Sequence, residues 1–243
     1  MRTPFISILL VLTAPAVLGQ SPVMTQTTRD RINLTGLTIP ATGVLYGVAG
    51  EAGKLIGDTY YDTTFQAGNV RFYGRIGAAD SLARVPIRYD LYAQEVEFRA
   101  GANDIRAAKA ASVLRFAINN QQGSTTRFIN VREFRGEADD LMGFFEQIVS
   151  GKLQLLQYHT VTIKKADFNI ALNVGIKDDV LVKKHEWYVA KGNRTQKFSA
   201  SKKSLLELMD NQHIAIDAFI KDKKPDLKRE SGLASVFAYY ASL

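Results

Sequence analysis

The stretch VPIRYDLYAQEVEFR, at residues 85–99, indicates the fold class more clearly than any other part of the chain. Its first half alternates apolar with polar residues, as at Ile87 and Arg88, and its second half resumes the alternation after Ala93-Gln94. A period of two is typical of a strand that buries one face. Two such strands separated by a short turn predict an antiparallel hairpin.

Further segments with the same alternation lie on both sides of this hairpin. They are residues 69–75, the pair 112–118 and 126–134, and the pair 185–190 and 195–200. The first pair flanks NNQQG at residues 119–123, and the second flanks KGN at residues 191–193. Asn and Gly favour turns, so each pair predicts another hairpin.

Residues 141–157 fit two different structures. Several of their apolar residues, Phe144 among them, recur at helical spacing. The turn dipeptide Ser150-Gly151, however, stands in the middle of the segment. We favour a hairpin, with a second strand that continues through residues 158–164.

The hydrophobic period changes after Ser199. Apolar residues then recur at spacings of three and four in three groups: Leu205, Leu208 and Met209; Ile216, Phe219 and Ile220; and Leu233, Val236, Phe237 and Tyr240. This spacing predicts three helices. Ser201 and Asn211 are placed to cap the first and second helices, and Pro225 is placed to end the second.

Strands followed by helices indicate an α+β fold. We expect an antiparallel, hairpin-rich sheet, with strong curvature left open, followed by three C-terminal helices that cover one face of the sheet or close its open side. Residues 59–243 form a single domain in this interpretation, hairpin-rich at 59–200 and helical at 201–243. Residues 20–58 show no sustained hydrophobic period and are expected to be a flexible lead-in.

Residues 1–19 have the layout of a secretory signal peptide. Arg2 precedes an apolar segment of about ten residues, whereas a membrane-spanning helix needs roughly twenty. Val17 and Gly19 stand at the −3 and −1 positions of a cleavage site, so we expect cleavage after Gly19. The mature chain is then expected in the periplasm or at the outer envelope. The sequence has no cysteine, which excludes disulfides and a lipid-modified leader cysteine.

The positive charge of the chain is concentrated in its second part. Residues 20–150 contain 14 basic and 14 acidic residues, whereas residues 151–243 contain 16 basic and 10 acidic ones. The basic residue type changes as well, from 12 Arg and 2 Lys to 2 Arg and 14 Lys. Solvation of exposed helices and strands accounts for such lysines, and an anion-binding face is the alternative. The candidate anion-binding residues are Lys183, Lys184, Lys202, Lys203, Lys221, Lys223 and Lys224.

Several short segments together carry a resemblance to a known group of proteins. They are Tyr60-Tyr61-Asp62 through Gly68-Asn69-Val70, residues 85–92, Gly151-Lys152-Leu153, residues 202–206 and Tyr239-Tyr240. The chain from Tyr60 onwards resembles a group of small exported proteins of unknown function that is common in Bacteroidetes. The resemblance implies an envelope location in a Gram-negative bacterium, and it implies no catalytic residue.

The residue patterns that usually accompany catalysis or metal binding are not found. Three histidines lack metal-ligand spacing, and no cysteine is present to complete a site: His159, His185 and His213. No Gly-x-Ser-x-Gly motif occurs. Asp139-Asp140 and Asp178-Asp179 fall at predicted turns, which suffices to explain them. We therefore expect no catalytic residue, no cofactor and no metal ion.

Three classes of function remain. The first is a non-catalytic envelope protein that binds another protein or an anionic surface polymer. The second is a periplasmic carrier of a lipid or another hydrophobic ligand, in which a curved sheet encloses an apolar cavity. An enzyme of unrecognised type is the third. Nucleic acid is not expected as a partner, and the 10 tyrosines are interpreted as packing residues, with sugar or peptide stacking as the alternative.

Overall fold

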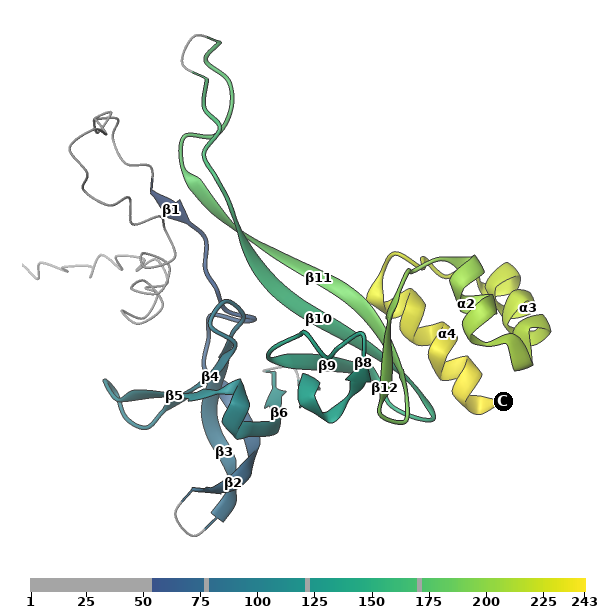
Figure 1. The fold of residues 1–243 in the computed structure, drawn as a ribbon, viewed down its shortest axis with the longest axis horizontal. Helices are drawn as coiled ribbons and strands as arrows, with labels where there is room; N and C mark the ends of the chain where they lie inside the picture. Colours follow the sequence, from purple (N-terminus) through teal and green to yellow (C-terminus); the bar gives the residue numbers. More distant parts are fainter. Residues whose placement is uncertain (1–53, 77–78, 121–122, 170–171) are drawn as a thin grey trace, which may run out of the picture.

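The computed structural model of this protein describes residues 54–76, 79–120, 123–169 and 172–243. The predicted signal peptide, and the predicted lead-in as far as residue 53, lie outside these described residues. Within them, the chain forms strands as far as Phe198 and three α-helices after it (Figure 1). The predicted α+β fold with C-terminal helices is confirmed.

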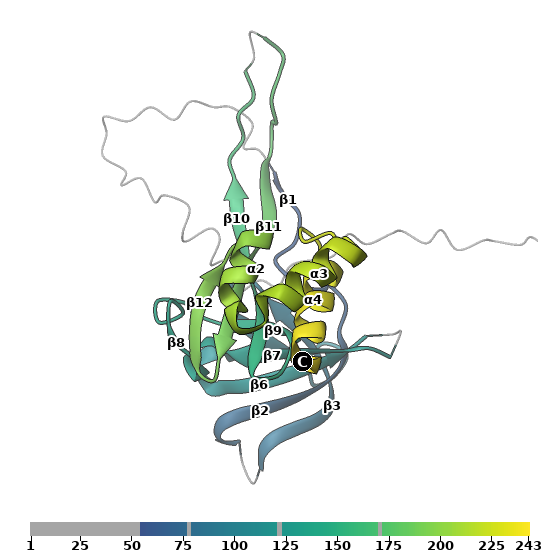
Figure 2. The ribbon, with the colours of Figure 1, turned by 90° about the vertical axis from the view of Figure 1, so that its right-hand side faces the viewer.

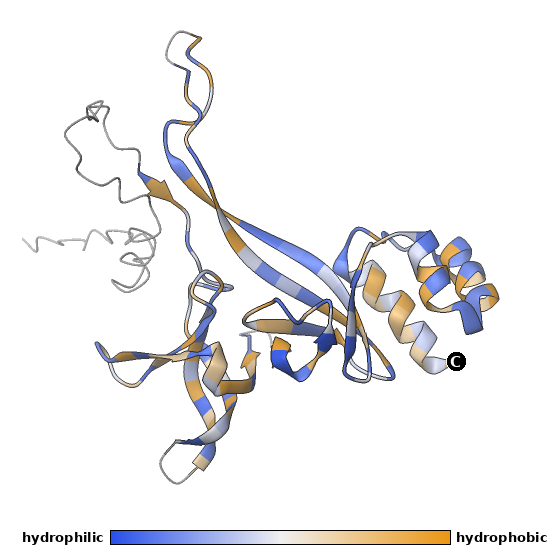
Figure 3. Cartoon of the chain, in the orientation of Figure 1, coloured by the Kyte–Doolittle hydropathy of each residue, from blue (hydrophilic) through white to orange (hydrophobic). Residues whose placement is uncertain are grey.

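The described strands form one sheet. Its order is β5-β4-β3-β2-β6-β7-β9-β10-β11-β12-β8, and β1 pairs with β11 outside this path. In chain order the strands are β1 Leu55–Ile56, β2 Gln66–Ile76, β3 Ala79–Asp90, β4 Glu95–Arg99, β5 Ile105–Lys109, β6 Val113–Asn119, β7 Thr125–Asn130, β8 Arg135–Gly136, β9 Phe144–Val149, β10 Leu153–Lys164, β11 Asp179–Lys191 and β12 Arg194–Phe198. Two short pairs, β1 with β11 and β8 with β12, are parallel, and the other neighbours are antiparallel. Figure 3 shows apolar and polar residues in alternation along the strands.

The predicted hairpins are present. Residues 85–99 contribute to the antiparallel pair of β3 and β4, in which Ile87 lies opposite Phe98. The strands β6 and β7 form the second predicted pair, and β11 and β12 form the third. The ambiguous residues 141–157 form a hairpin rather than a helix, since β9 pairs with β10 there.

Several features of the sheet differ from the sequence-based expectation, including β1, which forms at Leu55–Ile56 within the predicted lead-in. β5 forms from residues that show no clear alternation. β7 ends at Asn130, because Val131–Glu133 turns into a short 3-10 helix whose Arg132 N–H is capped by the Asn130 side chain. β11 begins at Asp179, earlier than predicted, and pairs with β10 as far as Lys164. The two strands form a ribbon that extends away from the rest of the molecule (Figures 1 and 2).

The first half of the sheet curves around an aromatic core. The buried residues of this aromatic core are Val70, Phe72, Ile87, Tyr89, Leu91, Val96, Val113, Phe116, Ile118, Phe128 and Phe144. The Tyr89 ring on β3 lies 5.5 Å from the Phe144 ring on β9, although the two strands are not neighbours in the sheet. The side-chain amide of Gln94, after β3, also donates to the carbonyl of His159 on β10. The sheet is therefore strongly curved in this half.

The helices cover one face of the second half of the sheet. They are α2 Lys202–Leu208, α3 His213–Lys223 and α4 Glu230–Ser242, and α4 packs on β9 and β10. Together with the strands they bury a helix-covered core of Leu153, Leu155, Trp187, Val189, Phe198, Leu205, Met209, Ile216, Ile220, Leu233, Val236 and Phe237. The prediction that the helices cover one face is confirmed.

The helix boundaries agree with one predicted cap and disagree with the other. Ser201 caps α2, since its hydroxyl accepts a hydrogen bond from the N–H of Ser204. The predicted cap at Asn211 is wrong, because Asp210–Gln212 forms a 3-10 turn and α3 begins only at His213. The Asn211 side chain accepts a hydrogen bond from the hydroxyl of Tyr240 instead.

A third group of apolar residues packs on the opposite face of β9, β10 and β11. This loop-covered core contains Val131, Phe134, Ala138, Phe145, Leu156, Tyr158, Tyr188 and Ala190. Because successive residues of a strand point to opposite faces, β10 contributes Leu155 to the helix-covered core and Leu156 to the loop-covered core. The middle of the sheet is therefore buried on both faces.

Residues 57–65 hold the start of the described chain against the body of the sheet. The N–H of Tyr61 donates to the carbonyl of Tyr89, and the N–H of Leu91 donates to the carbonyl of Thr59. The Tyr60 ring covers the guanidinium of Arg88 at 3.8 Å. Arg88 was expected on a polar face, but this cover leaves its side chain only 10% exposed and paired with Glu97 at 2.7 Å.

The lengths and hydropathy of the helices bear on whether the chain crosses a membrane. None of those in the described part of the chain combines the length with the apolar character that crossing a bilayer would demand.

Candidate functional site

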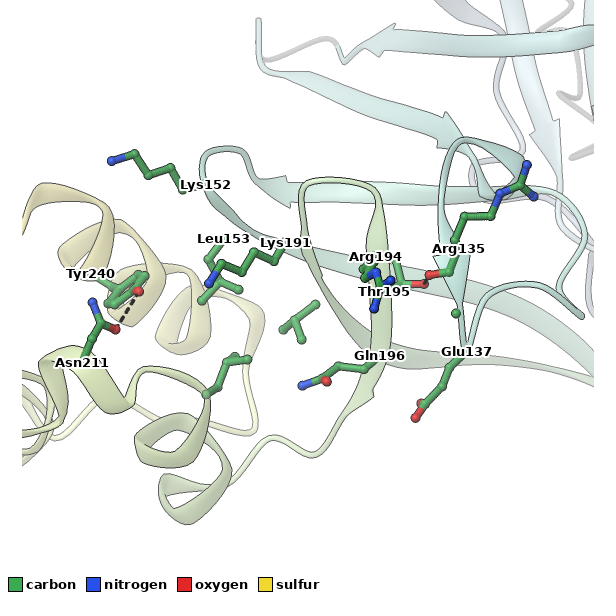
Figure 4. Close-up of a pocket in the computed structure, with 13 residues that line it drawn as sticks. Arg135, Glu137, Lys152, Leu153, Lys191, Arg194, Thr195, Gln196, Asn211 and Tyr240 are labelled. Carbon is green, nitrogen blue, oxygen red and sulfur yellow. Dashed lines mark hydrogen bonds between the residues drawn. The ribbon is translucent and has the colours of Figure 1, made fainter.

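A hollow of about 940 Å³ lies where the β11–β12 hairpin and β8 face the helices. Strand residues, the turn before β10, α2, the 3-10 turn and α4 all contribute to its lining, as Figure 4 shows. The lining residues are Arg135, Gly136, Glu137, Lys152, Leu153, Val189, Lys191, Arg194, Thr195, Gln196, Leu208, Asn211 and Tyr240. We call this hollow the basic groove.

Two glycines shape the strand side of the basic groove. Gly192 lies in the turn between β11 and β12. Its φ of +63° is a backbone conformation that residues other than glycine rarely adopt. Gly136, with φ +104°, lets β8 approach β12 so closely that an added Cβ would lie 2.6 Å from the carbonyl oxygen of Thr195. The turn places Lys191 and Arg194 directly opposite each other at the end of the hairpin.

The cations of the basic groove are exposed, and no carboxylate in the described part of the chain pairs with them. Lys152, Lys191 and Arg194 form no ion pair with any residue that the structure describes. Like charges directly opposite each other across two strands destabilise a sheet. The pair Lys191 and Arg194 therefore has no evident structural benefit, and its charge is available to an anion.

Uncharged groups complete the lining. Leu153 and Val189 form a buried apolar floor, and Tyr240 lies at the helix side with its hydroxyl bonded to Asn211 (Figure 4). An adjoining hollow of about 450 Å³ shares Lys152, Leu153, Asn211 and Tyr240 with the groove. The arrangement combines cations, amides and an aromatic ring along one extended depression.

Two charged residues of the lining contribute less to its potential. The guanidinium of Arg135 is directed away from the other labelled cations in Figure 4. Glu137 is the carboxylate among the described lining residues, and its Oε2 accepts a hydrogen bond from the N–H of Lys197 at 2.6 Å. The net charge that faces the groove is therefore positive.

The seven lysines predicted from the sequence lie elsewhere. Lys183 and Lys184 are on β11, and the other five are on or directly after α2 and α3. Five of the seven form ion pairs: Lys183 with Asp58, Lys202 and Lys221 with Asp217, Lys203 with Glu207, and Lys223 with Asp222. None of the seven lines the basic groove, as far as the described residues extend.

The structure brings two of these lysines together around one carboxylate. Lys202 of α2 and Lys221 of α3 approach Asp217 at 2.5 and 2.7 Å. Hydrogen bonds from Lys202 and then from Lys221 lower the pKa of Asp217 to about 2. Asp217 thus neutralises part of the helix charge that the sequence suggested for binding.

A second polar cluster lies between the two apolar cores on the same face of β10. His159 Nε2 lies 2.6 Å from Glu146 Oε2, and the hydroxyl of Tyr61 donates to the other oxygen of Glu146 at 3.2 Å. The His159 and Glu146 side chains are only 15% and 8% exposed. We call these three residues, with Gln157 beside them, the polar seam.

The pKa is raised at one member of the polar seam, Tyr61, and at its neighbour Glu230. Burial, followed by the charge of Glu146, raises the pKa of the Tyr61 hydroxyl well above its usual value. Partial burial and the charge of Glu146 also raise the pKa of Glu230, at the start of α4, while His159 acts in the opposite direction. The seam thus joins the lead segment, the sheet and the last helix.

The histidines, paired aspartates and tyrosines singled out in the sequence have contacts that account for them without a catalytic or metal-binding role. No group of three or more His, Asp or Glu residues suited to a metal ion occurs in the described ranges. Asp139 and Asp140 lie in a turn, and Asp179 at the start of β11 is bonded to Lys165, which lowers its pKa. Tyr60 and Tyr89 are buried, as the packing interpretation predicted.

The basic groove is not among the sites predicted from the sequence. Its cations come from separate turns, so they form no run in the sequence. One signal was nevertheless present, because the predicted turn at residues 191–193 places Lys191 opposite Arg194. A like-charged pair at the end of a predicted hairpin is a departure from ordinary sheet pairing.

Comparison of the chain with known protein families, with curated proteins and with solved structures finds no match in any of the three.

Proposed function

We propose that this protein is a non-catalytic, exported binding protein whose basic groove holds an anionic surface polymer. The observation that carries the proposal is the set of exposed cations Lys152, Lys191 and Arg194, which have no ion-pair partner among the described residues. In contrast, most of the predicted lysines are matched by neighbouring carboxylates.

The chemistry of the lining favours an acidic polysaccharide as the polymer. Arg presents a planar fork that suits carboxylates. Asn211 and Gln196 supply amide groups, and the Tyr240 ring offers a face for an apolar sugar surface. The hollow beside Tyr240 extends the groove beyond the size of a single small ion.

The alternative of a hydrophobic-ligand carrier has less support. A carrier needs an apolar cavity inside the curved sheet. The interior of the curve is occupied by the protein's own rings, since Phe116 and Phe128 stack at 4.5 Å and Tyr89 contacts both. The filled core favours the binding proposal.

The location of the protein is part of the same proposal. The predicted leader at residues 1–19 and the resemblance to exported Bacteroidetes proteins support export to the periplasm or outer envelope. N-terminal sequencing of the mature protein tests this, and an intact Met1 would contradict it.

The groove is tested with polygalacturonate as an acidic polymer and dextran as a neutral one. We expect the wild type to bind polygalacturonate only, with an affinity that falls sharply between about 0.1 and 1 M salt, because the Debye length shortens from roughly 10 to 3 Å. The double variant Lys191→Gln/Arg194→Gln should lose at least about tenfold in affinity, since two charge-assisted bonds are removed.

A matched variant removes the same charge elsewhere. Lys203→Gln/Lys223→Gln changes two exposed helix lysines that already face Glu207 and Asp222. We expect its affinity to stay within about twofold of the wild type, because surface pairs contribute little. An equal loss in both double variants would show that net charge, and not the groove, drives binding.

A further inference from the structure

Three arginines form a row on the outer face of the first half of the sheet. Arg71 of β2 lies directly opposite Arg115 of β6, and Arg127 of β7 is the diagonal neighbour of Arg115 across the next strand pair. The three strands are adjacent in the sheet, as Figure 2 shows. This face is the opposite of the one that buries Phe116 and Phe128 in the aromatic core.

The row is unfavourable for the sheet itself. Like charges directly opposite each other destabilise strand pairing. Arg115 and Arg127 have no ion pair within the part of the chain that the structure describes, and Arg71 has only Asp80, at 3.4 Å, with both side chains about half exposed. A sequence that departs from a local rule without structural compensation points to a function for the residues concerned.

The arginines border a shallow groove with an apolar floor. This arginine groove has a volume of about 410 Å³, and Ala83, Ala117 and Ile129 are among its lining residues. Among the described residues, it shares no lining residue with the basic groove. Forked cations around an apolar floor fit a chain that presents carboxylates and small apolar side chains together.

Residues 20–53 do not match such a chain. Residues 20–53, outside the described part, contain Asp30 and Glu51 as their acidic residues, and Arg29 and Arg31 flank the first of them. An acidic segment of another molecule therefore fits the arginine groove better than residues 20–53 do. An extended polypeptide places every second side chain on one face, so alternating acidic and apolar residues would reach both the arginines and the floor.

We infer that the arginine groove is a docking site for an acidic, extended segment of a partner protein. Arg115 and Arg127 bind carboxylates of the segment, Arg71 exchanges Asp80 for a third, and the apolar floor takes the small side chains between them. This site is separate from the basic groove, so the protein can hold a polymer and a protein partner on different faces. The inference does not depend on the proposed function.

The test uses a labelled twelve-residue peptide in which Glu alternates with Val or Ala, and a second peptide with Gln in place of Glu. We expect wild-type protein to bind the Glu peptide and not the Gln peptide. Arg115→Gln/Arg127→Gln should weaken binding by at least about tenfold, because charge-assisted bonds are lost. Arg115→Lys/Arg127→Lys should also weaken it, since an ammonium cannot form the two parallel bonds of a guanidinium.

Two matched double variants act as controls. Arg106→Gln/Lys109→Gln removes the same charge from β5, at an edge of the sheet, and Lys191→Gln/Arg194→Gln removes it from the basic groove. Both should bind the Glu peptide within about twofold of the wild type. Thermal unfolding of Arg115→Gln/Arg127→Gln should occur at the wild-type temperature or above it, because like-charge repulsion is relieved.

Several outcomes would overturn the inference. They are equal binding of the Glu and Gln peptides, an equal loss in the β5 variant, and a large fall in unfolding temperature for the arginine variant, which would make the arginines structural. Loss of polygalacturonate binding in the arginine variant, with peptide binding unchanged, would assign the row to a polysaccharide. A concentration-dependent dimer that the arginine variant abolishes would assign the face to a second copy of the chain.

Discussion

The aromatic core and the helix-covered core both bury apolar side chains of the same sheet, but they do so with different kinds of residue. Five of the eleven buried residues described in the aromatic core are aromatic, whereas three of the twelve in the helix-covered core are. No α-helix in the described part of the chain contributes to the aromatic core, and large rings from β3, β6, β7 and β9 reach across the curve of the sheet to one another. In the helix-covered core, mostly aliphatic side chains of the three helices pack on the face of β10, β11 and β12.

One strand, β10, takes part in both cores. The same face of β10 contributes Leu153 and Leu155 to the helix-covered core and packs Val161 against the aromatic core. Gln157 and His159 lie between them and belong to the polar seam. The seam interrupts the apolar surface, so each core can form around its own cover.

The largest effect is expected in the aromatic core. Phe128→Ala should lower the free energy of unfolding by about 5 kcal/mol, at the upper end for a buried Phe, because the ring contacts Tyr61, Tyr89 and Phe116. Chemical denaturation of the purified variant measures this. A loss of unfolding free energy well below that of Phe237→Ala would contradict the greater contribution expected from the aromatic core.

A smaller loss is expected in the helix-covered core. Phe237→Ala should cost about 3–4 kcal/mol, since the residue is 1% exposed but has one aromatic partner, Phe198. Denaturation followed by both near- and far-ultraviolet circular dichroism should show one transition. Deletion of residues 225–243 with stability unchanged would show instead that α4 is separate from the sheet.

Disrupting the polar seam should lower the free energy of unfolding by less than either core substitution does. His159→Ala removes the partner of a nearly buried carboxylate, Glu146, and we expect a loss of about 1.5–3 kcal/mol, the range for hydrogen bonds to charged groups. The exposed His185→Ala is the control and should change stability by less than about 0.5 kcal/mol. Equal effects in the two variants would mean that the seam contributes nothing specific.

The smallest effect concerns the pH dependence of stability. The pKa of Glu230 is raised from its usual 4.5, so the folded protein holds this proton more tightly than the unfolded chain does. Ionisation of Glu230 therefore reduces stability as the pH rises through that value and above it. The stability of Glu230→Gln relative to wild type should be greater at about pH 7 than at about pH 4. The opposite trend would contradict the raised pKa.

The strands and helices could be predicted because their periods are local properties. Alternation at residues 85–99 and the spacing of Leu233, Val236 and Phe237 depend on nearby residues only. β5 was missed because its residues, IRAAK, are mostly exposed and lack a buried stripe. The start of α3 was misplaced because a 3-10 turn precedes it, in which Asn211 accepts a hydrogen bond from Tyr240 of α4.

The sites could not be predicted in the same way, because distant turns and strands assemble them. The basic groove joins Lys152 to Arg194 through the fold, and the arginine groove depends on the pairing order β2-β6-β7. Total charge pointed instead to the helix lysines, most of which have carboxylates beside them. Charge becomes informative only when its neutralising partners are known.

The ribbon of β10 and β11 sets a distance between two ends of the molecule. β1 joins the first residues of β11, near Asp179, whereas the basic groove lies at the last, near Lys191. Thirteen residues of strand span about 40 Å. A force applied to the chain upstream of Lys54 would thus first strain the short β1–β11 pairing and the bond between the Lys54 N–H and Asp178. The groove is mechanically remote from that point, so we expect a ligand held there to stay bound while the upstream chain is pulled away.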